Sequence, residues 1–130
     1  MSKLVELLRA TPDALYVKGC TDSQIELAQT ELNMVFPKEY QDFLRNFGAM
    51  RFDGHEWFGL NVSGYLNVVD ATKQEKSVNP SFPANCFVLE DLGIDAKLIV
   101  VDEDGIVYLL QRTQKNKIAD KISDYFLMLC

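Results

Sequence analysis

The sequence predicts a single α+β domain over residues 1–130, in which N-terminal helices pack on a mainly antiparallel sheet and a C-terminal helix covers one face. Three observations predict this class. Apolar residues recur at helical spacing between Thr21 and Gly48, extended apolar runs follow Met50, and helical spacing returns near the end. With 130 residues and 48% hydrophobic content, the chain is long enough to bury its own core.

A short first helix is predicted from three leucines that share one face, Leu4, Leu7 and Leu8. It should end near Ala10, because Pro12 disfavours the helical conformation in the residue before it. An extended stretch over residues 14–17 is expected to lead from this helix to the next one.

Two capped helices are predicted between Thr21 and Gly48. Thr21 and Gln24 have the spacing of a capping box, in which each side chain accepts from the backbone N–H of the other residue. Pro37 suits the start of the second helix, since its missing N–H needs no partner there. Gly48 should end that helix, because glycine adopts a left-handed conformation without steric cost. Two apolar faces accompany these signals: Ile25, Ala28 and Leu32, then Tyr40, Phe43, Leu44 and Phe47.

After Gly48 the pattern changes from helix to strand. A hairpin is predicted from Met50–Phe52 and Glu56–Leu60, with Asp53-Gly54 as its turn. Val68–Ser77 has the pattern of a short helix with a polar outer face, and two prolines make Asn79–Pro83 a loop.

Three strands and a last helix are predicted from Cys86 onward. The strands are Cys86–Asp91, Lys97–Asp102 and Ile106–Gln111, and the Asp104-Gly105 turn makes the last two an antiparallel hairpin. The middle strand is almost continuously apolar, so we expect it to be central. The C-terminal helix is predicted from apolar residues at helical spacing: Ile118, Ile122, Tyr125, Phe126 and Leu129.

Charge and cysteine content indicate the compartment and exclude some partners. The net charge of −6 disfavours direct nucleic-acid binding, because phosphates repel an acidic surface. Cys20, Cys86 and Cys130 are scattered and odd in number, which argues against a disulfide framework and favours a reducing compartment. No run has the length of a signal-peptide core or a membrane span. We therefore expect a cytoplasmic protein that does not bind membranes.

Residues for catalysis or metal binding are few. His55 is the only histidine, and general-base catalysis would require a nucleophile within hydrogen-bond reach. Asp102, Asp104 and Gly105 imitate the start of a calcium loop, but Ile106 stands at the next ligand position. One histidine without paired cysteines does not make a structural zinc site. We therefore expect a protein that is not an enzyme, with no catalytic residues, no metal and no cofactor.

The aromatic residues of the predicted hairpin have two interpretations. Trp57 with Phe52, Phe58 and Tyr65 would form either an exposed platform or part of the core. Aromatic residues in strands are more often buried, so Trp57 and Phe87 are expected in the core.

An acidic segment lies between Glu90 and Asp104. It holds six carboxylates beside the single lysine Lys97, namely Glu90, Asp91, Asp95, Asp102, Glu103 and Asp104. Two interpretations remain open. Charges on turns usually face solvent and do no more, whereas six carboxylates on adjacent strand ends would direct one negative field at a basic partner. These six residues are the candidate partner-binding site.

The order and spacing of the motifs resemble the SUKH superfamily of bacterial toxin-immunity proteins, which includes the Smi/Knr-like regulators of fungal cell-wall assembly. An acidic residue in the first of the two capped helices, Glu26 or Glu31, is part of this resemblance. The other resembling parts cover most of the chain: Phe36–Leu44 (FPKEYQDFL), Phe47-Gly48, Glu56–Leu60 (EWFGL) and Phe87–Leu110, which includes the DGIVY sequence at Asp104–Tyr108.

The resemblance implies an immunity protein that binds a cognate polymorphic toxin and neutralises it without catalysis. A nuclease toxin with a cationic groove suits an acidic surface, which would compete with the nucleic acid. The alternative implied by the fungal branch is an adaptor or regulatory interaction module of the Smi/Knr type. A third class, an enzyme acting through His55, would require a paired nucleophile. The gene beside this one would distinguish the first two.

Overall fold

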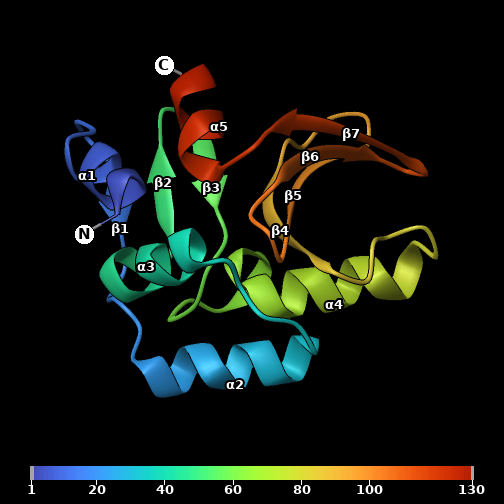
Figure 1. The fold of residues 1–130 in the computed structure, drawn as a ribbon, viewed down its shortest axis with the longest axis horizontal. Coiled ribbons are helices and arrows are strands. Elements are labelled where there is room, and N and C mark those ends of the chain that lie inside the picture. Colours follow the sequence, from blue (N-terminus) through green and yellow to red (C-terminus); the bar gives the residue numbers. More distant parts are fainter. Residues whose placement is uncertain (1, 130) are drawn as a thin grey trace.

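Helices dominate the first part of the chain and strands the second (Figure 1). The computed structural model describes residues 2–129. Within that range the elements are α1 (Lys3–Arg9), β1 (Leu15–Tyr16), α2 (Asp22–Leu32), α3 (Lys38–Phe47), β2 (Met50–Phe52), β3 (His55–Trp57), the 3₁₀ helix η1 (Gly64–Leu66), α4 (Val68–Val78), β4 (Cys86–Asp91), β5 (Lys97–Asp102), β6 (Val107–Gln111), β7 (Gln114–Ala119) and α5 (Ile122–Met128).

The strands form two antiparallel sheets, with the orders β1-β2-β3 and β4-β5-β6-β7. The Phe58 N–H donates to the Leu89 carbonyl at 2.8 Å, which joins the chain after β3 to β4. In Figure 1 the four-stranded sheet curves above α4, while α2 lies beneath α3 and α4. The predicted α+β class with its C-terminal helix is confirmed, and β5 is an inner strand as expected. Within residues 2–129, no helix is long and apolar enough to cross a membrane.

The predicted capping box of α2 is present. The Gln24 N–H donates to Thr21 Oγ1 at 3.2 Å, and the Thr21 N–H donates to Gln24 Oε1 at 2.9 Å. Pro37 is the cap of α3, one residue before its first helical turn, and Gly48 ends that helix with a φ of 73°. Local sequence signals therefore determine where these two helices begin and end.

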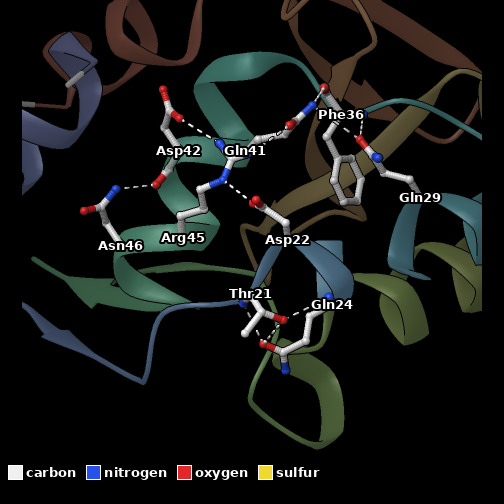
Figure 2. A network of polar contacts seen from close by, with 9 residues as sticks. All are labelled: Thr21, Asp22, Gln24, Gln29, Phe36, Gln41, Asp42, Arg45 and Asn46. Carbon is white, nitrogen blue, oxygen red and sulfur yellow. Dashed lines mark hydrogen bonds and ion pairs between the residues drawn. The ribbon is translucent and has the colours of Figure 1, made fainter. Parts of the chain in front are cut away.

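Polar side chains link α2 to α3 and to the connection between them (Figure 2). Arg45 on α3 contacts Asp22 on α2 at 2.7 Å and Asp42 on its own helix at 3.0 Å. The hydrogen bond to Asp22, followed by the charges of Asp22 and Asp42, raises the pKa of Arg45. Near the other end of α2, Gln29 Oε1 accepts from the Phe36 N–H at 2.8 Å. Contacts at the start of α2 and near its end therefore both tie this helix to α3 or to the segment before it.

Aromatic side chains fill the core between α3, the two sheets and α5. Trp57 and Phe87 are both fully buried, as predicted. Tyr40 lies 4.3 Å from Phe87 between ring centroids, and its hydroxyl donates to the Phe58 carbonyl at 2.6 Å. Ring contacts of Trp57 extend the cluster from Phe43 to Tyr125 and Phe126. The predicted apolar face of α3 is therefore the centre of the core.

Helix α4 lies along the outer edge of the four-stranded sheet. The hydroxyl of Thr72, which is fully buried, accepts from the Val88 N–H at 3.0 Å. The side chain of Asn67 caps the helix by accepting from the N–H groups of Val69 and Asp70. An unpaired strand edge would attract other strands, so the helix also protects β4 from such pairing.

The prediction of three C-terminal strands was incomplete, because residues 114–119 form the fourth strand β7. Ile118 belongs to this strand and not to the C-terminal helix, which begins at Ile122. The turn before β7 contains Arg112, a residue with a φ of 56° that lacks the Asn-Gly or Asp-Gly signal. Most of β7 is exposed and polar, so its sequence has no apolar alternation.

Candidate functional site

The six acidic residues of the candidate site do not form one surface. Strand β5 separates them, since Asp91 and Asp95 flank the turn before Lys97 whereas Glu103 and Asp104 follow Asp102. A strand of this length separates its ends by about 17 Å. Of the two interpretations left open, one negative field from adjacent strand ends does not fit this arrangement, because the two hairpin turns lie at opposite ends of the strand.

Asp102 is a structural residue of the β5–β6 turn and is only 5% exposed. Its Oδ1 accepts from the N–H groups of Asp104 and Ile106 at 2.9 and 3.0 Å, and its Oδ2 accepts from the Tyr108 hydroxyl at 3.0 Å. Desolvation and this hydrogen bond raise the pKa of Tyr108 to about 12, so the phenol remains a donor. Asp102 is therefore not a solvent-facing charge of the turn.

Glu90 is also buried, at 3% exposure, and joins three elements. One carboxylate oxygen lies 2.6 Å from His55 Nδ1 on β3, and the other accepts from the Tyr125 hydroxyl on α5 at 2.8 Å. The register of β4 and β5 shifts between Val88 and Glu90, and a bulge of this kind redirects the following side chain. Glu90 therefore does not contribute to an exposed acidic surface.

His55 lies in the β2–β3 hairpin against Glu90 and the Phe52 ring, whose centroid is 5.6 Å away. The thiols of Cys20 and Cys86 are buried, and desolvation raises the pKa of each to about 11, which disfavours a nucleophilic thiolate. Cys130 lies outside the described residues. Among the residues that are described, no three His, Cys, Asp or Glu side chains gather to hold a metal ion.

A hollow of about 750 Å³ lies at the start of α3 and is called here the α3 groove. Its charged lining is mixed, with Glu39, Asp42, Asp104 and Asp120 beside Lys38 and Lys121. Glu39 already accepts from the N–H groups of Ile122 and Ser123 at the start of α5. Asp104 is the one predicted site residue that lines this groove, in a lining that carries both signs of charge.

A second hollow of about 360 Å³, the α4 groove, lies between α4 and strands β4 and β5. Buried apolar side chains of Phe58, Val88 and Leu98 line it, together with the exposed ring of Tyr65. Its charged side chains are all acidic: Asp70, Glu75 and Asp91. Among the six predicted residues, Asp91 is the one that lines this groove.

Asp70 and Glu75 were missed by the sequence interpretation, which treated α4 as a helix with an ordinary polar face. Only a weak signal is present in the sequence: Gln74 lies one turn after Asp70 and Glu75 one turn after Ala71, so these residues occupy one broad side of the helix, about 140° wide. The sequence does not show that this side faces Asp91. That juxtaposition depends on how α4 docks beside β4 through Thr72.

The family comparison covers nearly all of the chain. The family model SUKH_5, described as SMI1-KNR4 cell-wall, matches residues 1–129. The chain belongs to the SUKH family. This confirms the resemblance drawn from the motifs, and it makes the protein consistent with an immunity-type or Smi/Knr-like function. A comparison with curated proteins gives no match.

Two of the SUKH-like motifs meet at a crossing of backbones. The Leu60 N–H, at the end of the EWFGL segment, donates to the carbonyl of Gly48 at 2.9 Å. A side chain on Gly59 would overlap that same carbonyl, so Gly59 has to lack a Cβ atom. The motif glycines of this SUKH chain therefore allow the end of α3 to pack directly against the segment after β3.

Proposed function

We propose that this SUKH protein is a bacterial immunity protein that binds a cognate polymorphic toxin in the cytoplasm and neutralises it by non-catalytic contact. Membership of the SUKH family supports the class. The observation that carries the mechanism is the α4 groove, where Asp70, Glu75 and Asp91 surround apolar side chains with no basic residue in the lining. Such a surface suits a basic partner, because opposite charges speed association and suppress wrong partners.

A nuclease is the class of toxin that this surface suits best. Nucleases need a cationic surface to bind their substrate, and an acidic protein on that surface competes with the nucleic acid. The exposed members of the predicted set, Asp91, Asp95, Glu103 and Asp104, remain candidates for contact with the toxin. Glu90 and Asp102 stabilise the fold instead. Glu90 contacts His55 and Tyr125, and Asp102 holds the β5–β6 turn.

A second candidate function is an adaptor or regulatory module of the Smi/Knr type. The description of the matching family, SMI1-KNR4 cell-wall, favours it. Such a module would also bind another protein through its surface, but without suppressing a toxic activity. The two functions therefore differ in the partner and in the consequence of binding.

Co-expression tests the proposal. The toxin domain encoded beside this gene is induced in bacteria with and without the SUKH protein, and growth and complex formation are measured. We expect full protection and a complex that survives size-exclusion chromatography. A toxin that kills equally in both strains and does not co-elute would contradict the proposal.

A His55→Gln variant separates binding from catalysis. Glutamine keeps a donor that can contact Glu90, but it cannot act as a general base at neutral pH. Non-catalytic neutralisation predicts that this variant protects cells at one molecule per toxin, as the unsubstituted protein does. Loss of protection by a variant that still binds the toxin would favour an enzymatic role for His55.

A further inference from the structure

The α4 groove has the composition of a binding site for a side chain that is both long and positively charged. Phe58, Val88 and Leu98 are nearly inaccessible and form an apolar lining, while Asp70 and Asp91 are exposed on opposite elements. The volume of about 360 Å³ falls in the range of ligand-binding pockets. An apolar lining between carboxylates fits an alkyl stem that carries a cation at its end.

The carboxylates of the α4 groove have no internal counter-charge. Among residues 2–129, neither Asp70, Glu75 nor Asp91 forms an ion pair. The nearby lysines of α4 are used elsewhere, since Lys73 pairs with Glu31 and Lys76 donates to the Ala84 carbonyl. Desolvation, together with the charge of Asp91, raises the pKa of Glu75. The carboxylates of Glu75 and Asp91 therefore repel each other in the protein without a partner.

In the α3 groove, by contrast, most of the carboxylates already have partners. Lys38 and Lys121 line it with the acidic residues, Glu39 caps α5, and Asp120 pairs with Lys117. An incoming cation would have to displace interactions at Glu39, Asp42 or Asp120, and among residues 2–129 only Asp104 of these acidic lining residues has no ion pair or cap. In the α4 groove it would meet carboxylates that lack a basic partner.

We propose that the α4 groove is the surface that receives the toxin, and that its occupant is a segment with an arginine between apolar residues. The inference rests on the proposed function for the identity of this partner. A guanidinium group binds carboxylates through two parallel hydrogen bonds and stacks on aromatic rings. Asp70, Glu75 and Asp91 provide the carboxylates, and the exposed ring of Tyr65 provides a face for stacking.

A peptide titration tests the groove independently of the toxin. The probe is a blocked tetrapeptide of alternating leucine and arginine, added to ¹⁵N-labelled protein at low salt and followed by NMR. We expect saturable shifts at the amides of Ala71, Gln74, Val88 and Leu98. A leucine–glutamate peptide of the same length should cause none. Shifts spread evenly over the surface, or located at the α3 groove, would overturn the inference.

Matched charge variants then test the groove against the toxin. The groove variant combines Asp70→Asn, Glu75→Gln and Asp91→Asn, which keeps side-chain shape and removes charge. The control variant removes the same charge elsewhere through Asp13→Asn, Glu26→Gln and Asp53→Asn, three exposed residues outside both grooves and outside the predicted acidic set. We expect at least about a tenfold loss of toxin affinity in the groove variant at low salt, and little change in the control. The loss should shrink at about 1 M salt, where the Debye length is about 3 Å.

The outcomes distinguish this inference from the proposed function. If the unsubstituted protein binds the toxin and the groove variant binds equally well, the groove is not the interface and the immunity function stands. If both variants lose affinity equally, net charge explains the effect and the inference is wrong. If the unsubstituted protein does not bind the toxin, the proposed function fails, and the peptide titration decides whether the groove binds arginine. Thermal unfolding of each variant shows whether a loss of binding comes from a loss of fold.

Discussion

The Tyr125 hydroxyl donates to Glu90 Oε1 at 2.8 Å, which joins the last helix to the first strand of the four-stranded sheet. The other oxygen of the same carboxylate lies 2.6 Å from His55 Nδ1, so β3 is included in the contact. A buried carboxylate is stable only while its hydrogen bonds are made, because loss of one partner leaves a desolvated charge. Burial and the charge of Glu90 raise the pKa of Tyr125, so the phenol stays protonated and donates.

Loss of this contact should destabilise the fold. Glu90→Gln removes the charge from both hydrogen bonds, and we expect the free energy of unfolding to fall by about 1–3 kcal/mol. Tyr125→Phe keeps the ring stacked on Trp57 and should cost a similar amount, since it leaves a carboxylate oxygen unpaired. Urea denaturation of both single variants and of the double variant measures the coupling. Simple additivity of the two changes would show that the contact contributes little.

The β5–β6 turn should depend on Asp102 and not on its neighbour. Asp102→Ala leaves two backbone N–H groups and the Tyr108 hydroxyl without their acceptor, and each buried unsatisfied group costs about 1–3 kcal/mol. We expect a loss within or above that range. Asp104→Ala is the matched control, and a change within about 0.5 kcal/mol is expected for this exposed residue. Equal losses in both variants would show that the turn, not the carboxylate, determines stability.

Ionised Glu75 should oppose folding at neutral pH. Its raised pKa means that the folded state binds the proton more tightly than the unfolded state does. This contribution to stability is complete below the unfolded pKa of about 4.5, and it is lost as the pH rises through the folded value. Glu75→Gln should therefore raise the midpoint of thermal unfolding at pH 7, and the gain should vanish near about pH 3. The exposed Glu26 on α2 gives the control, because Glu26→Gln should show no such difference.

Phe43 tests the helical core. Its ring is fully buried and lies 5.6 Å from Tyr40 and 5.8 Å from Trp57 between centroids. Phe43→Ala should lower the free energy of unfolding by about 3–5 kcal/mol, the usual cost of truncating a buried aromatic residue. Leu27 on α2 is 61% exposed, so Leu27→Ala should change the free energy of unfolding by about 0.5 kcal/mol or less. A loss well under about 1 kcal/mol for Phe43→Ala would contradict the packing described above.

Features determined by local sequence were predicted well. The capping box of Thr21 and Gln24, the end of α3 at Gly48 and the Asp-Gly hairpins all follow from residues close together in the chain. Burial of Trp57 and Phe87 followed from the preference of aromatic residues for strand cores. Strand β7 was missed because its turn at Arg112 has no glycine and its exposed residues do not alternate.

The candidate site was harder to predict because it depends on tertiary structure. Proximity in sequence suggested that six carboxylates act together, but strand β5 separates the two turns. The bulge next to Glu90 and the turn hydrogen bonds of Asp102 make both of these residues part of the fold. Asp70 and Glu75 approach Asp91 only when α4 packs beside β4, which no local pattern in the sequence specifies.

The backbone crossing at Gly48 and Gly59 has an evolutionary consequence. The contact is made by main-chain atoms, so it restricts which residues can occupy the two crossing points but does not restrict the charged residues of the α4 groove. Relatives can therefore carry other residues at the positions of Asp70, Glu75 and Asp91 without disturbing this backbone packing. The proposed function then predicts that relatives with different toxins retain both glycines, while the charges of the groove change with those of the toxin.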